Sequence, residues 1–177
     1  QLQNLTAEHF GGEQYNGCND YLVISYPAAV EKVHRSFLEV GVDVLETDTF
    51  RSNRLTMKEY NLQDRVIEIN MAAAQLAKKL ADEYSTARAD GRPPQPRFVA
   101  GSIGPSGKLP STNDPDLSNV TYDELIAAFR EQAVGLIRGG VDVLLIETSQ
   151  DILEVKAAII GLHKAFDETQ VYLPIQA

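Results

Sequence analysis

The chain has 177 residues, of which 44% are hydrophobic and 23% charged, and its formal net charge is -9. This composition suits one globular domain with a hydrophobic core, and it lacks the clustered Lys and Arg that nucleic acid requires. No apolar run approaches the roughly 20 residues of a membrane helix, and no signal-peptide pattern is visible. The single cysteine, Cys18, excludes an internal disulfide, which fits the reducing cytoplasm. One cysteine and three dispersed histidines offer no metal-ligand spacing, so we expect no zinc site within this chain.

Helical and strand patterns alternate along the chain after an irregular stretch at 1–26. Pro27 suits the first turn of a helix, where its missing N–H is harmless. A capping box, Thr121-x-x-Glu124, opens a later helix, and Asp151 suits the N-cap of the last one. The expected elements are helix 27–40, strand 42–46, helix 65–89, strand 97–104, helix 121–140, strand 141–147, helix 151–166 and a strand within 171–177. A loop with some helical character is expected at 51–62 and a long polar loop at 105–120.

This alternation indicates an α/β fold with a parallel sheet covered by helices. The stretch Gly-Val-Asp-Val recurs at 41–44 and at 140–143, where a helix gives way to a strand. A weak internal repeat of this kind favours a (β/α)8 TIM barrel. An open doubly wound sheet is the alternative, although no Gly-rich phosphate fingerprint follows the first strand.

Polar residues stand where three apolar strands end. Glu147 follows the run Val-Asp-Val-Leu-Leu-Ile, Glu46 and Asp48 follow an earlier run, and Ser102 closes a third. In either fold the carboxyl ends of the strands form the ligand-binding side, where a carboxylate can receive a substrate amine or act as an acid or base. Alternatively, Glu147 caps the following helix or pairs with a Lys or Arg. For Glu46 and Asp48 a structural role is favoured more strongly, because strand alternation cannot turn every residue toward a barrel mouth.

Three stretches, GVDVLETDTF, RFVAGSIGPSGK and GVDVLLIETSQDILEVKAA, resemble the homocysteine S-methyltransferase family. The similarity is greatest to the homocysteine-binding domain of its cobalamin-dependent methionine synthases, whose long loop before the third helix resembles TNDPDLSNVTYDEL. The family motifs Glu-Thr-Asn-Thr-Phe, Val-Ala-Gly-x-x-Gly-Pro and Ile-Glu-Thr-x-x-Asp occur in the same order. Asp48 stands where the first of these motifs has Asn.

The resemblance implies a (β/α)8 barrel that takes part in methyl transfer to the sulfur of homocysteine. In this family three cysteines hold a zinc ion that binds the sulfur as a thiolate. In methionine synthases the methyl donor is methylcobalamin, recharged by methyltetrahydrofolate on other domains, so homocysteine and those domains are the implied partners. The glutamate of the third motif contacts the amino-acid end of homocysteine and corresponds to Glu147. We expect Thr148, Ser102 and Asp48 to contribute to the same substrate-binding site.

The resemblance further implies that residues 1–177 are a partial homocysteine-binding domain. They look like strands two to five of the barrel, with the first strand and the last three strands absent. The zinc cysteines belong to the sixth and eighth strands, so we expect them beyond Ala177, and Cys18 matches none of them. We therefore expect no catalytic residue, zinc or cobalamin on this chain, and no activity from it alone. Because an incomplete barrel has unpaired strand edges, we expect the isolated residues to be soluble only as an oligomer or in a poorly packed state.

Three other functions stay open. The chain could be a non-catalytic half-barrel that serves as a binding or assembly module. It could belong to a stand-alone homocysteine methyltransferase with another methyl donor. An unrelated barrel enzyme such as an aldolase would need a lysine at a strand end for a Schiff base, and only Lys108, in a loop beyond the third strand pattern, comes near that position.

Overall fold

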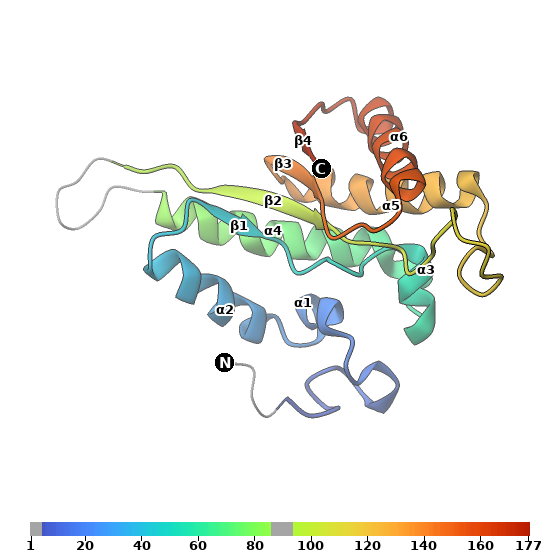
Figure 1. Cartoon of the computed structure of the whole chain (residues 1–177). Helices are drawn as coiled ribbons and strands as arrows, with labels where there is room; N and C mark the ends of the chain where they lie inside the picture. The colour runs from blue at the N-terminus through green and yellow to red at the C-terminus, as the bar shows by residue number, and fades with distance from the viewer. Residues whose placement is uncertain (1–4, 86–93) are drawn as a thin grey trace.

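The computed structural model describes residues 5–85 and 94–177, which contain a four-stranded parallel sheet with helices packed along it (Figure 1). Each strand pairs with the next in the chain, in the order β1-β2-β3-β4. The strands are β1 (Val44–Glu46), β2 (Phe98–Ile103), β3 (Val143–Ile146) and β4 (Ile175–Gln176). The helices are α1 (Leu22–Ser25), α2 (Pro27–Glu39), α3 (Arg54–Met57), α4 (Val66–Tyr84), α5 (Tyr122–Gly139) and α6 (Ile152–Thr169). Among the described residues, no helix is both long and apolar enough to cross a membrane.

The predicted alternation of helix and strand is confirmed, although several elements are shorter than the sequence indicated. α4 occupies most of the helix expected at 65–89, of which residues 86–89 lie outside the described ranges. The strand expected within 171–177 consists of the two residues of β4. The stretch 1–26, expected to be irregular, holds the short helix α1. α3 lies within 51–62, where some helical character was expected.

Helix starts follow the capping signals in the sequence. Pro27 is the first residue of α2. In the capping box of α5, Glu124 N donates to Thr121 Oγ1 at 3.2 Å, and Thr121 N donates to the Glu124 carboxylate at 2.8 Å. Leu153 N donates to the Asp151 carboxylate at 2.8 Å at the start of α6. These caps satisfy backbone N–H groups that have no partner within the helix.

The α/β class with a parallel sheet is confirmed. The strand order follows the chain order without reversal, whereas a doubly wound sheet reverses its order at a switch point. This order favours the barrel over the doubly wound alternative. Closure of the barrel, and the assignment of these strands as two to five of eight, stay predictions.

The two faces of the sheet differ in burial at the amino-terminal end of β1 and β2. Leu45, Val99 and Leu144 point toward the helices and are at most 3% exposed. On the opposite face Val44 pairs with Phe98, and these side chains are 47% and 46% exposed. The core of this chain therefore lies between the sheet and the helices. In a closed barrel the other face would be covered by side chains of further strands.

Two glycines allow α5 to approach α4 closely. A Cβ atom on Gly135 would lie 2.8 Å from Asn70 Cβ, and one on Gly139 would lie 2.4 Å from Ala74 Cβ. Both distances are shorter than carbon atoms tolerate. The glycines lie one helical turn apart, so they form a continuous contact with α4. Figure 1 shows α4 running beside β1 and β2, so this contact also holds α5 against the sheet.

The substitution Gly139→Ala is expected to lower the free energy of unfolding by about 1–3 kcal/mol, the usual cost of overpacking a core. The expected sign is informative because a helical Ala is ordinarily preferred to Gly. Urea denaturation followed by circular dichroism measures the change. Ala127→Ser on the exposed face of α5 is the control, with an expected change below about 0.5 kcal/mol. Unchanged or greater stability of Gly139→Ala would contradict the tight α4–α5 contact.

Candidate functional site

The carboxyl ends of β1 and β2 are joined by two threonine side chains. Thr47 N donates to Ala100 O at 3.0 Å, as in a regular parallel ladder. Ser102 N then donates to Thr47 Oγ1 at 3.0 Å, and Thr49 Oγ1 donates to Ser102 O at 2.7 Å. The two threonine hydroxyls are themselves 2.6 Å apart. Both residues are buried, so water does not compete for these bonds.

A glutamine from α5 completes this junction. Gln132 is fully buried, and its Nε2 donates to Thr49 O at 2.8 Å and lies 3.5 Å from Ser102 O. A close backbone contact lies beyond it: Gly104 N donates to Phe50 O at 3.0 Å. A Cβ on Gly104 would come within 2.5 Å of that oxygen, so this position requires glycine.

Three of the four predicted substrate-binding residues lie together at this edge. Ser102 Oγ donates to Glu147 Oε1 at 2.6 Å, and Thr148 Oγ1 lies 3.4 Å from Glu147 Oε2. Glu147 N donates to Ile103 O at 3.1 Å, which continues the β2–β3 ladder by one residue. Thr148 then adopts a φ of 59°, a left-handed conformation that is costly for a β-branched residue. The chain therefore makes a sharp turn immediately after Glu147, and the Glu147 carboxylate stays at the strand end.

The two structural roles considered for Glu147 do not match its surroundings. The N-cap of α6 is Asp151. Among the described residues, Glu147 forms no ion pair with a Lys or Arg. Its side-chain hydrogen bonds there come from two neutral hydroxyls, those of Ser102 and Thr148. The carboxylate is half-buried and retains an oxygen that can receive a cationic group.

The fourth predicted residue, Asp48, points elsewhere. It lies beside the buried carboxylate of Asp20 and lines a cavity of about 440 Å³ between α2 and β1. Glu46 and the buried His34 line the same cavity, whose other walls are mostly apolar. The pKa of Glu46 is raised, first by partial burial and then by the negative charge of Glu147, so the two carboxylates interact electrostatically. The structure thus groups Ser102, Thr148 and Glu147, and leaves Asp48 at a neighbouring cavity.

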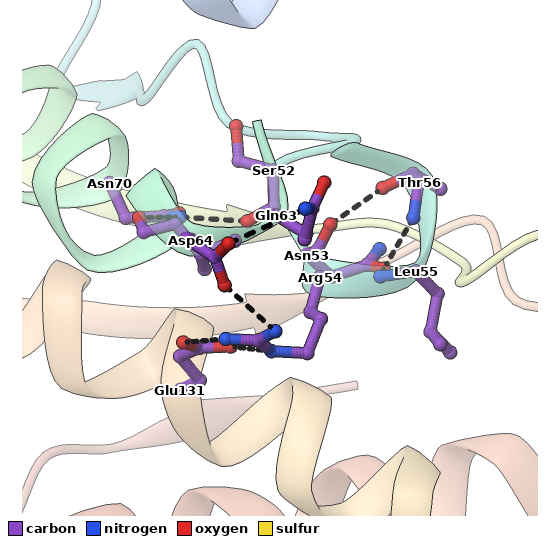
Figure 2. A network of polar contacts seen from close by, with 10 residues as sticks. Ser52, Asn53, Arg54, Leu55, Thr56, Gln63, Asp64, Asn70 and Glu131 are labelled. Carbon is purple, nitrogen blue, oxygen red and sulfur yellow. Dashed lines mark hydrogen bonds and ion pairs between the residues drawn. The ribbon is translucent and has the colours of Figure 1, made fainter. Parts of the chain in front are cut away.

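The loop that follows β1 is fixed by polar contacts at several points (Figure 2). Figure 2 shows the Arg54 guanidinium between two carboxylates, at 2.9 Å from Glu131 and 3.3 Å from Asp64. Asn70 of α4 donates to Ser52 O at 2.8 Å. The loop therefore cannot shift without breaking contacts to α4 and α5. These contacts also restrict the movement of Thr47 and Thr49 at the start of the loop.

The loop that follows β2 is held by the first turn of α6. Ser106 N donates to the fully buried Glu154 carboxylate at 2.8 Å, and Ser111 N donates to Asp151 at 2.8 Å. Within this loop, Lys108 Nζ donates to Asn119 Oδ1 at 2.5 Å. Because the Lys108 amine is engaged inside its own loop, the geometry gives no support to a Schiff-base lysine at the strand end.

The residues present do not fit a zinc site. No group of three or more His, Cys, Asp or Glu side chains suited to a metal ion occurs within the described ranges. Cys18 is buried, and desolvation together with the nearby Asp20 carboxylate raises its pKa to about 11. A thiol that resists ionisation is a poor ligand for zinc, which binds thiolate. Ala177 directly follows β4, and the expectation that the family's zinc cysteines lie beyond Ala177 stays a prediction.

The sequence placed Ser102, Thr148 and Glu147 at the strand ends but assigned no role to Thr49 or Gln132. A signal for Gln132 was present. It occupies a position on the apolar face of its helix, one turn after Phe129, where a polar residue needs a buried partner. Nothing in the local pattern marks Thr49, because its role depends on the carbonyl of a residue far away in the sequence.

Solved structures with a similar fold include two of the homocysteine methyltransferase MmuM from Escherichia coli. The metallated form is 18% identical in sequence, with a TM-score of 0.65 over 84% of this chain. The oxidised form is 17% identical, with a TM-score of 0.67 over 86% of this chain. The chain spans about half the length of these structures, 50% and 51%. At this identity the likeness concerns the fold.

The sequence itself is matched by a family model. The model described as homocysteine S-methyltransferase covers residues 1–176, which is nearly the whole chain. The match includes the strand ends that carry Ser102, Glu147 and Thr148. On this evidence, the chain belongs to the homocysteine S-methyltransferase family.

Proposed function

We propose that this chain binds the amino-acid end of homocysteine within an enzyme that methylates the homocysteine sulfur, and that the full-length protein is a methionine synthase. The observation that carries the proposal is the half-buried Glu147 carboxylate at the end of β3, held by Ser102. An ammonium group would form a charge-assisted hydrogen bond with it, which is stronger than a neutral one. Family membership supports homocysteine as the source of that ammonium group.

The reacting groups are proposed to lie outside this chain. Zinc, which would supply a thiolate-stabilising charge, and cobalamin, which would supply the methyl group, are implied by the family resemblance for the full-length protein. The residues described here would bind and orient the substrate rather than form or break bonds. The methylcobalamin and methyltetrahydrofolate domains would be its partners, and the single buried thiol suits a cytoplasmic protein.

A stand-alone homocysteine methyltransferase with another methyl donor is a second candidate. The solved structures with a similar fold favour it, because both are forms of a homocysteine methyltransferase. The long loop at 105–120, anchored on α6, supports the methionine synthase through the family resemblance. Glu147 would have the same role in either protein, since both would bind the same amino acid.

The substitution Glu147→Gln in the full-length protein is expected to weaken homocysteine binding by about 1.5–3 kcal/mol, the range for a hydrogen bond to a charged group. Glutamine keeps the shape of the side chain and removes its charge. Isothermal titration calorimetry measures the affinity, and metal analysis should find the zinc content unchanged. Glu168→Gln, in an exposed pair with Arg130 on the outer helices, is the matched control. Equal homocysteine affinity of wild type and Glu147→Gln would return Glu147 to a structural role.

Asp48 differs from the family motif, and its charge depends on pH. Burial, and then the neighbouring Asp20 carboxylate, raise the pKa of Asp48 from 3.8 to about 7. Its carboxyl group is therefore partly protonated near neutral pH and can donate or accept a hydrogen bond. We propose that it contributes to the substrate site from the side of the cavity.

The raised pKa of Asp48 predicts a pH-dependent stability. The pKa of Asp48 in the folded state lies above its value in the unfolded state. The contribution of Asp48 to the free energy of unfolding is therefore fully present below about pH 4 and is lost as the pH rises through about 7. Asp48→Asn removes the charge, so it should raise the free energy of unfolding at pH 8 by about 1–3 kcal/mol and change it little at pH 4. Denaturant titrations across this range measure the difference. The exposed Asp116→Asn is the control, and the prediction is wrong if both variants show the same pH dependence.

A further inference from the structure

We propose that Thr47 and Thr49 are positioning residues for the homocysteine site, and that they orient Glu147 through Ser102. The inference rests on the proposed function, because it concerns how the same carboxylate is aimed. Neither threonine needs to touch the substrate: both are buried and contact Ser102.

The backbone N–H of Ser102 is held by the side chain of Thr47. Thr47 N donates to Ala100 O, and a regular parallel ladder would continue with Ser102 N donating to Thr47 O. The acceptor is instead Thr47 Oγ1, at 3.0 Å. The side chain thus replaces the backbone as partner of β2, and the chain of β1 is free to turn away while the end of β2 stays satisfied.

The backbone carbonyl of Ser102 is held by the side chain of Thr49. Thr49 Oγ1 donates to Ser102 O at 2.7 Å, and Gln132 Nε2 holds Thr49 O at 2.8 Å. The N–H and C=O groups of Ser102 are therefore both bonded to hydroxyls of one loop. The braces on that loop, including Arg54 with Glu131, limit its movement.

The side chain of Ser102 in turn contacts Glu147. A serine hydroxyl has one proton, and that of Ser102 is donated to Glu147 Oε1 at 2.6 Å. Ser102 is 2% exposed, so its hydroxyl is shielded from solvent and acts on the carboxylate. The other oxygen, Oε2, lies toward the exposed Thr148 and can receive the ammonium group. Through Ser102, the threonines therefore set the orientation in which the Glu147 carboxylate meets the substrate.

The test compares homocysteine with 4-sulfanylbutanoate, which has the same thiol and carboxylate but no amine. The ratio of their affinities for the full-length protein isolates the ammonium contact from sulfur binding and from overall stability. Thr49→Val and Thr47→Val keep the side-chain shape and remove the hydroxyl. Each is expected to lower the ratio by about threefold to tenfold, the range for one hydrogen bond, with the affinity for 4-sulfanylbutanoate unchanged.

Three further variants make the outcome decisive. Thr56→Val removes another buried threonine hydroxyl of the same loop, which contacts Arg51 O and Asn53 O but not Ser102. It is expected to lower stability and leave the ratio unchanged. Thr49→Ser restores the hydroxyl and should restore the ratio. If Thr49→Val does not fold, Ser102→Ala tests the last link of the same chain and should produce the same fall.

The results separate this inference from the proposed function. A wild-type protein that binds both compounds equally, or a Glu147→Gln variant that keeps the preference for homocysteine, would refute the ammonium site itself. A preference that is lost in Glu147→Gln but fully kept in Thr47→Val and Thr49→Val, or in Ser102→Ala where Thr49→Val fails to fold, would overturn the positioning role alone.

Discussion

The hydrogen bond from the Thr49 hydroxyl to the Ser102 carbonyl is the contact on which the strand ends depend. β1 is three residues long and β4 two, so backbone pairing alone holds little of this sheet together at its carboxyl side. The side chains of Thr47 and Thr49 extend the pairing beyond the end of β1, and Gln132 ties the junction to α5. Removal of one partner would leave a buried polar group without a bond, and this penalty exceeds the net contribution of the bond itself.

The rest of the site follows from this junction. A loop that leaves the sheet early can carry Asp48 toward α2 while the end of β2 keeps its position under Glu147. The loop after β1 is held by Glu131 of α5, which pairs with Arg54, and by Asn70 of α4. The loop after β2 is held by Glu154 of α6. The packing of α4 against α5 is in turn set by close contacts such as Gly139 with Ala74. Helix packing and site geometry are therefore parts of one arrangement.

The sequence predicted most of what local chemistry determines. Helix starts at Pro27, Thr121 and Asp151 follow from caps and from the rigid proline ring, and parallel pairing follows from the alternation of elements. The motifs placed Ser102 and Glu147 at neighbouring strand ends, and these side chains are in contact. Whether they bind substrate stays a prediction.

What the sequence could not predict depends on residues that are distant along the chain. Asp48 and Thr49 are adjacent, and nothing in the pattern says that one turns to the Asp20 carboxylate and the other to β2. The partner of Gln132 is likewise decided by how α5 crosses the sheet, which periodicity does not reveal. The length of β4 is set by pairing with β3, and its apolar residues gave no measure of it.

The unequal burial of the two sheet faces bears on the order in which such a chain folds. The largest helix contacts join consecutive long helices, α4 with α5 and α5 with α6. Only the segment 140–151 separates α5 from α6, so we expect that contact to form early. Val44 and Phe98, on the other face, remain about half exposed among the described residues. We expect a growing polypeptide to complete its helix-side core during synthesis and to cover the opposite face last. In that interval its exposed apolar side chains would be targets for chaperones and for association with other chains.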